Sequence, residues 1–209
     1  MWRNVLGPNA RVIGKDLNPK IRSLEEQGFE VFIGDMGLEK AWDQLSELLG
    51  GPESVDLLID DGGHTNVQQI KAVSRGLELV KPGVFLIIED THASFMRKFA
   101  NPSRYSGWNF LSELMTDCQI RRQSRSQLRF PHISLQISRF LVPTGIVAIK
   151  KGTPAELEIG VASSGADDTL GTFDYRWEAM SESRVFRALT LISKMTRHLF
   201  PIQRIAIWF

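Results

Sequence analysis

Two apolar segments of this chain end directly in acidic side chains. The segments are residues 55–59 and 84–88, and the acids that follow them are Asp60, Asp61, Glu89 and Asp90. Continuous apolar runs of this length are typical of parallel strands that are buried on both faces. Neighbouring strands lie about 5 Å apart, so two such strands would bring their acidic ends together. In open α/β sheets, ligands bind at this carboxyl edge.

Carboxylates gathered at one sheet edge favour a metal ion, because they would repel one another without a cation among them. An all-oxygen set suits a hard divalent ion such as Mg²⁺ better than zinc. A plainer interpretation is that Asp60 and Asp90 cap the following helices or accept hydrogen bonds from loop amides. Both interpretations stay open here, and two matched strand ends favour the metal.

His64 follows Asp61 by three residues and can face the same site. A neutral imidazole beside a metal can take a proton from a substrate hydroxyl. The alternative is a histidine at a helix start that faces water. Structural or surface roles are expected for the side chains that stand in no motif, which are His132, His198 and Cys118.

Two further acids stand at predicted strand ends, Asp16 after residues 12–14 and Asp35 after residues 32–34. An acid in this position of a Rossmann-like unit commonly accepts hydrogen bonds from ribose hydroxyls, so Asp16 fits a cofactor that contains a nucleoside. The sequence has no G-x-G-x-x-G, Walker, H-E-x-x-H or G-x-S-x-G motif. This argues against nucleotide kinases, zincins and α/β-hydrolases.

The elements that position these residues alternate between apolar runs and amphipathic stretches, which is the pattern of βαβ units in a mostly parallel sheet. The fold class is therefore predicted to be α/β. Predicted strands cover residues 11–14, 29–33, 55–59 and 84–88, followed by a less regular pair at 133–142 and 145–149. Predicted helices cover residues 18–27, 38–49, 65–80, 108–115 and 182–200.

The overall charge favours neither nucleic acid nor an anionic membrane as a partner. The chain has 209 residues, with 25 Lys and Arg against 24 Asp and Glu and a formal net charge of +1. Such a balance creates no field that would attract a polyanion. Seven basic residues and no acid lie between residues 118 and 151. This stretch suits a phosphate-binding patch or, as we favour, a solvated loop face.

Cys118 is the only cysteine, so an intrachain disulfide is excluded and a cytoplasmic location is the default expectation. The chain shows no signal peptide pattern and no uncharged apolar stretch of 18 residues. After a stretch rich in Gly, Ser and Ala, the predicted helix at 182–200 is amphipathic and leads into an apolar end. We expect this segment to pack on the body or to mediate homo-oligomerisation, with membrane-surface attachment as the alternative.

Four motifs occur in order along the chain and together resemble a class I methyltransferase. They are Ile13-Gly14-Lys15-Asp16-Leu17-Asn18-Pro19, Phe32-Ile33-Gly34-Asp35, Leu58-Ile59-Asp60-Asp61-Gly62-Gly63-His64 and Ile87-Ile88-Glu89-Asp90-Thr91-His92. More narrowly, the set is similar to the S-adenosylmethionine- and Mg²⁺-dependent sugar O-methyltransferases of natural-product pathways. These are the macrocin and mycinamicin type, with the related cephalosporin hydroxylase and rhamnosyl O-methyltransferase group. The likeness covers about residues 1–151.

The resemblance implies a Rossmann-like methyltransferase sheet and O-methyl transfer from S-adenosylmethionine to a hydroxyl of a small polar metabolite, plausibly a glycosylated one. It implies that His64 is the catalytic base. The family's other positions are the cofactor contacts Asp16, Asp35 and Asp60 and the metal ligands Asp61, Glu89 and Asp90, with Asp60 as the alternative to Glu89.

In the family, a strand and a glycine-rich loop precede the stretch that matches Met1-Trp2-Arg3. We therefore expect residues 1–151 to form an N-terminally incomplete methyltransferase-like domain with a gap in the middle of its sheet. Residues 152–209 are expected to be a linker and an amphipathic extension. Lys15 also stands where the family usually has an apolar residue. The alternative function is a non-catalytic methyltransferase-like module that acts through partner binding.

Overall fold

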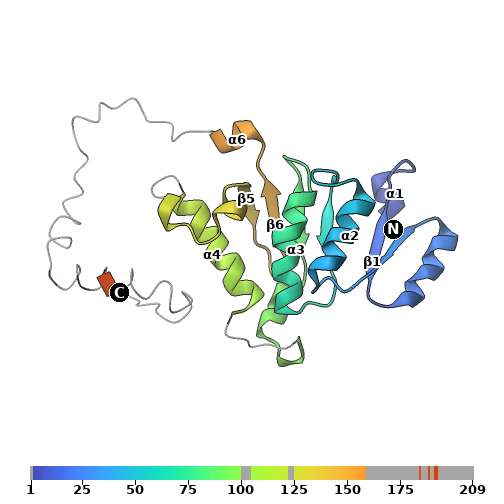
Figure 1. Ribbon diagram of the computed structural model, residues 1–209, viewed down its shortest axis with the longest axis horizontal. Helices are drawn as coiled ribbons and strands as arrows, with labels where there is room; N and C mark the ends of the chain where they lie inside the picture. Colours follow the sequence, from blue (N-terminus) through green and yellow to red (C-terminus); the bar gives the residue numbers. More distant parts are fainter. Residues whose placement is uncertain are drawn as a thin grey trace. The chain divides into compact units, whose positions relative to one another are not determined.

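The computed structural model describes residues 2–99, 105–121 and 125–158, together with the single residues 184, 188, 191 and 192 (Figure 1). The chain divides into two compact units, residues 1–157 and 158–209. The first unit holds every predicted site residue. No helix within the described residues is long and apolar enough to cross a membrane.

Strands and helices alternate through the first unit, as the sequence pattern predicts. The strands are β1 (Ile13–Asp16), β2 (Glu30–Ile33), β3 (Leu58–Asp60), β4 (Phe85–Ile88), β5 (Ile137–Leu141) and β6 (Val147–Lys151). The α-helices are α1 (Trp2–Leu6), α2 (Glu39–Leu49), α3 (Asn66–Leu79), α4 (Gly107–Ile120), α5 (Pro131–Ser134) and α6 (Pro154–Glu158). The 3₁₀ segments are η1 (Pro19–Gln27), η2 (Thr91–Phe95), η3 (Arg97–Phe99) and η4 (Arg125–Gln127).

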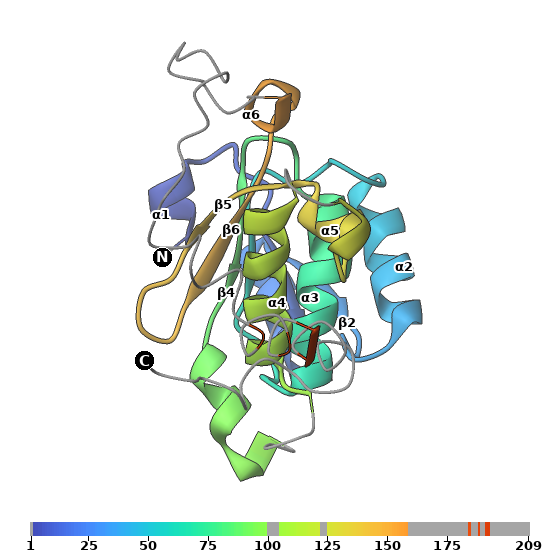
Figure 2. The same cartoon turned by 90° about the vertical axis from the view of Figure 1, so that its left-hand side faces the viewer.

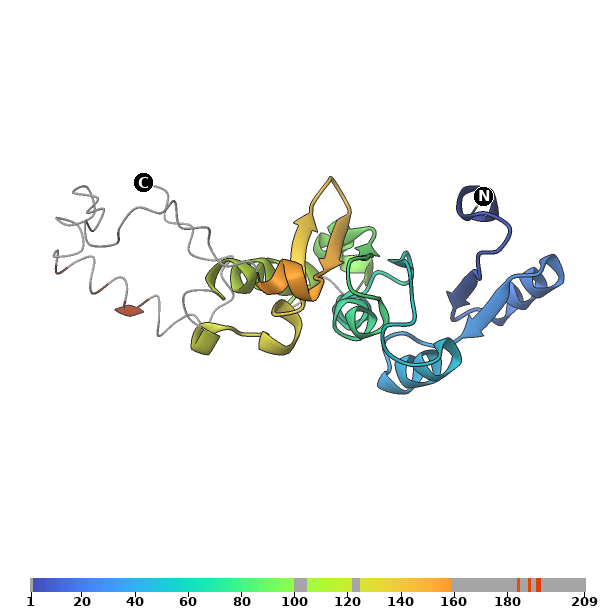
Figure 3. The ribbon, with the colours of Figure 1, turned by 90° about the horizontal axis from the view of Figure 1, so that it is seen from above.

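The strands form two sheets. β1 and β2 pair in parallel as one sheet, and the other has the strand order β3-β4-β6-β5. β3 and β4 are parallel, whereas β6 runs antiparallel to both of its neighbours. Seen from above, the blue β1–β2 pair stands apart from the remaining strands (Figure 3). Within the described residues, β1 and β3 each have a strand partner on one edge only. The strands are thus interrupted between the β1–β2 pair and β3.

A local sequence signal marks the start of α3 and the end of α2. α3 starts with a capping box, in which Thr65 Oγ1 accepts a hydrogen bond from the backbone N–H of Gln68 at 3.3 Å, and the Gln68 side chain accepts one from the N–H of Thr65. α2 ends at Gly50, whose φ of 93° lies in the left-handed region that residues with a side chain rarely adopt.

One apolar core holds the two sheets together. Helices α2, α3 and α4 lie side by side along one face of the strands (Figure 2). Trp42 of α2 is 1% exposed, and its indole N–H donates to the carbonyl of Met36 at 2.9 Å. It belongs to the same buried cluster as Leu77, Leu86 and Ile149. Phe32 of β2 packs against this cluster, which therefore connects the β1–β2 sheet with the rest of the unit, since apolar burial is the main stabilising term in folding.

Several element boundaries differ from those predicted. Residues 19–27 form a 3₁₀ helix, and none of its residues is buried, so little tertiary packing favours the α form. β3 is shorter than the apolar run that predicts it, because Val55 forms only an isolated bridge with Val80. In the predicted helix at 182–200, the described residues are Arg184, Ala188, Leu191 and Ile192, which are helical and exposed; the rest of that helix lies outside the described residues.

Four of the seven basic residues between 118 and 151 hold the fold together. Arg121 donates to the carbonyl of Ser134 at 2.9 Å, and Lys151 donates to the carbonyl of Val80 at 3.0 Å. The other two form ion pairs, Arg129 with Glu113 and Lys150 with Glu156. Within the described residues, these four basic side chains therefore pair with carbonyl or carboxylate groups of the fold.

Candidate active site

The carboxyl ends of β3 and β4 lie side by side and bring the predicted acids together. The two parallel strands are in register, with Asp60 opposite Ile88, and the N–H of Glu89 donates to the carbonyl of Asp60 at 2.9 Å. This pairing sets the two loops that follow, which carry Asp61 and Asp90, next to each other. The juxtaposition that the matched strand ends predict is present.

Asp61, His64 and Asp90 form one cluster. Each offers a ligand atom, and these atoms lie within 4.8 Å of one another. His64 Nε2 lies 3.5 Å from Asp90 Oδ2 and 4.0 Å from Asp61 Oδ1. The imidazole is largely covered, with 16% of its side chain exposed, whereas Asp61 and Asp90 are 63% and 48% exposed. The histidine is thus fixed between two carboxylates that remain open to solvent.

Two residues of this cluster have left-handed backbones. His64 has a φ of 55° and Asp90 a φ of 51°. This conformation costs a residue with a side chain on the order of 1–2 kcal/mol, and such strain often occurs at functional sites. The surrounding structure must therefore hold both residues in place.

Gln69 of α3 supports the strained backbone at Asp90. Its side-chain amide donates to the carbonyls of Glu89 and Asp90, at 3.2 and 3.3 Å, and the residue is only 2% exposed. The carbonyl of Asp90 also accepts from the N–H of Ala93 at 2.8 Å. Sequence reasoning missed Gln69. The available signal was a polar residue at the helical spacing of buried positions, since Asn66, Gln69 and Val73 share the covered face of α3.

Two rings complete the surroundings of the cluster. Phe99 of η3 meets the His64 ring edge to face, with centroids 5.6 Å apart. His92 Nδ1 lies 3.8 Å from Asp90 Oδ1. His92 belongs to a motif that the sequence analysis singled out, whereas nothing in the sequence pattern pointed to Phe99.

Glu89, the third predicted metal ligand, and the predicted cofactor contacts lie outside the Asp61–His64–Asp90 cluster. Asp60 forms an ion pair with Lys15, and Glu89 contributes no side-chain atom to the Asp61–His64–Asp90 group within the described residues. Asp16 Oδ1 accepts from the N–H of Asn18 at 2.9 Å.

Asp35 Oδ1 accepts from the N–H of Gly37 at 2.8 Å and lies 3.5 Å from the side-chain amide of Gln68. Asp35 and Asp16 thus each use one oxygen to shape a turn after a strand. The second oxygen of each carboxylate has no hydrogen bond within the described part of the chain.

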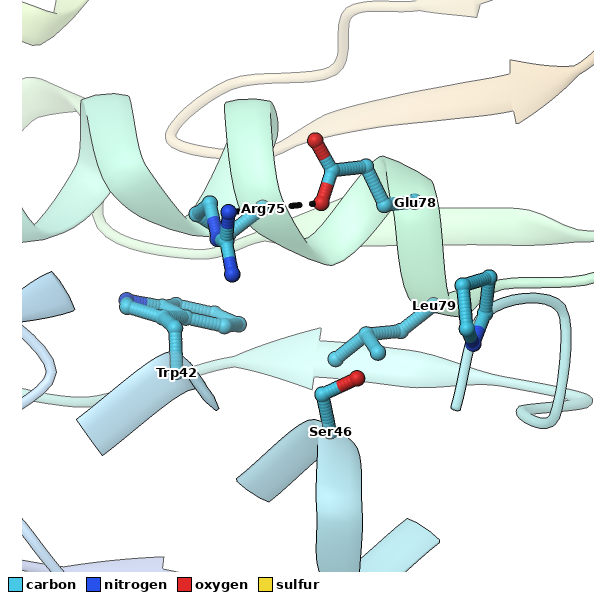
Figure 4. Close-up of a pocket in the computed structure, with 6 residues that line it drawn as sticks. Trp42, Ser46, Arg75, Glu78 and Leu79 are labelled. Carbon is cyan, nitrogen blue, oxygen red and sulfur yellow. Dashed lines mark ion pairs between the residues drawn. The ribbon is translucent and has the colours of Figure 1, made fainter. Parts of the chain in front are cut away.

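A small pocket lies away from this cluster, near the C-terminal ends of α2 and α3 (Figure 4). Its lining residues are Trp42, Ser46, Pro52, Arg75, Glu78 and Leu79. Arg75 forms ion pairs with Glu39 and Asp43 of α2 and with Glu78 of its own helix. The pocket lies between two packed helices, and its charged side chains are engaged in these ion pairs.

Comparisons with known proteins give a structural likeness only. No protein-family model matches the chain, and no curated protein matches it. A crystal structure of the MycE methyltransferase from the mycinamycin biosynthetic pathway, in complex with Mg and SAH, superposes with a TM-score of 0.66 at 20% sequence identity. The match covers 87% of this chain and 45% of that one.

A second structure of MycE contains Mg, SAH and mycinamycin VI. It superposes with a TM-score of 0.61 at 20% identity, covering 78% of this chain and 41% of that one. The chain thus spans less than half the length of the structures it matches. A likeness at this identity establishes architecture, and the first unit has the α/β, Rossmann-like fold of a methyltransferase.

Proposed function

We propose that this chain takes part in O-methyl transfer from S-adenosylmethionine, assisted by Mg²⁺, to a hydroxyl of a small polar metabolite. The single observation that carries the proposal is the Asp61–His64–Asp90 cluster at the carboxyl ends of two parallel strands. The solved MycE structures, which contain Mg and SAH, support the same choice of metal and cofactor.

The chemistry of the cluster fits Mg²⁺. This ion is commonly held by one or two carboxylates and keeps several of its waters. Asp61 and Asp90 can provide the two carboxylates, and their exposed positions leave room for the waters. Bound there, Mg²⁺ would supply Lewis-acid polarisation of a substrate oxygen. Glu89 remains a proposed ligand, which would require its side chain to turn toward the cluster.

His64 is the proposed base. Its Nε2 faces both carboxylates, and Phe99 covers one edge of the ring, so the imidazole has a fixed direction. An acceptor hydroxyl placed beside Asp61 and Asp90 would lie within reach of this nitrogen, which removes the hydroxyl proton as the oxygen attacks the methyl group. The methyl group then passes from the cofactor sulfur to that oxygen, leaving S-adenosylhomocysteine.

The proposed cofactor contacts are Asp16, Asp35 and Asp60. Asp16 ends β1 and Asp35 follows β2 at the same sheet edge, and each has a carboxylate oxygen that could accept a hydrogen bond from ribose or adenine. We further propose that the acceptor is glycosylated and that the reaction belongs to natural-product biosynthesis. The proposal also includes a cytoplasmic location and a homo-oligomeric state.

Metal titration tests the site directly. In calorimetric titrations with MgCl₂, Asp61→Asn and Asp90→Asn should each weaken binding at least about tenfold, because each removes a charged ligand. Asp56→Asn is the matched control, since Asp56 precedes β3, is exposed and pairs with Lys81 at the opposite end of the strand. Unchanged binding in both site variants would reject the assignment.

Titration with S-adenosylhomocysteine separates the enzyme from the alternative, a non-catalytic module that acts through partner binding. Micromolar binding by the folded chain supports the enzyme, whereas no binding supports the module. In a methyl-transfer assay, His64→Ala should lower turnover and leave the affinity for S-adenosylhomocysteine unchanged. Unchanged turnover would remove His64 from the role of base.

A further inference from the structure

We propose that the Lys15–Asp60 ion pair is the receptor for the amino-acid end of the cofactor. The ammonium of the ligand would bind to Asp60 and its carboxylate to Lys15. The inference rests on the proposed function, because it assumes an S-adenosyl compound at this edge of the sheets. It assigns a part in recognition to Lys15, which stands where the family that the sequence resembles usually has an apolar residue.

The pair joins the two sheets at their carboxyl ends. Lys15 Nζ lies 2.7 Å from Asp60 Oδ1, which connects the end of β1 with the end of β3. The two side chains are 16% and 6% exposed, so this pair is far more covered than Asp61 and Asp90. Charges removed from water in this way are expensive unless further hydrogen bonds satisfy them.

Both partners have unused hydrogen-bonding capacity. A lysine ammonium carries three donors and a carboxylate about four acceptor positions. Within the described residues, one hydrogen bond joins Lys15 to Asp60, and their side chains make no other. Lys15 Nζ also lies over the Trp42 ring, 5.8 Å from its centroid. An amino-acid zwitterion can satisfy both groups at once and leaves the net charge of the site unchanged.

A glycine lies against the pair. A Cβ at Gly62 would stand 3.4 Å from Asp60 Oδ1 and 3.8 Å from Lys15 Nζ, within ordinary contact distance of both. The lack of a side chain at Gly62 thus keeps side-chain atoms off this side of the two charges.

The position of the pair also agrees with the shape of the cofactor. In sequence, Lys15 is adjacent to Asp16, the proposed ribose contact, and Asp60 is adjacent to Asp61, the proposed metal ligand. In an S-adenosyl compound, the ribose, the methyl group and the amino-acid arm are all joined to one sulfur, so the groups that bind the arm must lie near both the ribose contact and the place of methyl transfer. The ion pair adjoins both in sequence.

The test compares two ligands that differ in the amino-acid arm. S-adenosylhomocysteine carries the arm, and 5′-methylthioadenosine has a methyl group in its place. Affinities of both are measured by calorimetry for the natural chain and for Lys15→Met and Asp60→Asn. Each variant should weaken the binding of S-adenosylhomocysteine about tenfold or more and the binding of 5′-methylthioadenosine less than twofold. Only S-adenosylhomocysteine loses a charge-assisted hydrogen bond to its amino-acid arm. Arg11→Met, which removes the exposed Arg11–Glu30 pair, should change neither affinity.

Every other outcome overturns the inference. If the pair only joins the sheets, the variants will melt at lower temperature, but the ratio of the two affinities will stay the same. If Lys15→Met binds S-adenosylhomocysteine more tightly, the lysine obstructs the ligand. Both results leave the proposed function standing. If the natural chain binds neither compound, the proposed function fails together with the inference.

Discussion

Replacing Gln69 by methionine would remove the amide that supports Asp90 while keeping the length of the side chain. The variant loses two hydrogen bonds, to the carbonyls of Glu89 and Asp90, each of which contributes about 1 kcal/mol net. It also removes the Gln69 Oε1 atom, which is buried without a hydrogen-bond partner, and this returns about 1 kcal/mol. The free energy of unfolding should therefore fall by only about 1 kcal/mol.

The effect on the proposed metal site should be larger than the effect on stability. The two lost contacts contribute about as much free energy as the left-handed conformation of Asp90 requires, on the order of 1–2 kcal/mol. Without them, Asp90 can relax toward ordinary backbone angles, which turns its carboxylate away from Asp61 and His64. Residues that orient metal ligands typically change affinity by about 10- to 100-fold, so Mg²⁺ binding should weaken about tenfold.

Urea unfolding and Mg²⁺ calorimetry on the same samples provide the two measurements. Leu114→Ala is the control, because Leu114 is fully buried on α4 and its truncation should lower stability by about 2–5 kcal/mol without removing a support of Asp90. Native Mg²⁺ affinity in Gln69→Met would refute the reasoning. So would an equal loss of affinity in Leu114→Ala, since the effect would then follow stability alone.

Three further predictions follow from other parts of the fold. Burial raises the pKa of the Cys118 thiol from 9.0 to about 11, so at pH 8 iodoacetamide should label the native chain about 100-fold more slowly than the urea-unfolded chain; equal rates would contradict its burial. Trp42→Ala should lower the free energy of unfolding by about 3–5 kcal/mol in urea titrations, and Trp42→Phe, which loses the hydrogen bond to Met36, should lower it less. The hydrogen bond from Lys150 lowers the pKa of Glu156 from 4.5 to about 2, so its stabilising contribution is present above about pH 4.5 and lost as the pH falls toward 2. In an NMR titration, Lys150→Met should raise that pKa toward 4.5, and an unchanged pKa would contradict this origin of the shift.

The sequence predicts those elements whose limits are set locally. α2 and α3 lie within a residue or two of their predicted ranges, because Gly50 and the Thr65–Gln68 capping box act through neighbouring backbone groups. The grouping of Asp61 with Asp90 was also predictable, since it follows from two matched apolar strands that pair in parallel.

The sequence does not predict which side chains at that edge pair with one another. Asp60 and Asp61 are adjacent, yet one faces Lys15, 45 residues away, and the other faces His64. The choice depends on how the two sheets lie against each other, which no local period encodes. The same holds for the left-handed backbone of Asp90, which depends on Gln69 from another element.

The position of β6 in the sheet has a consequence for folding during synthesis on the ribosome. β6 lies between β4 and β5, so the second edge of β4 gains its partner only from residues 147–151. These residues emerge about 60 positions after β4, which at ordinary rates of translation corresponds to roughly 3–12 s. During this interval, the nascent chain presents an apolar strand with unpaired N–H and C=O groups, a template for association with other chains. Slow translation through this region, or a chaperone that covers the strand, would therefore influence how much of the newly made chain reaches its folded state.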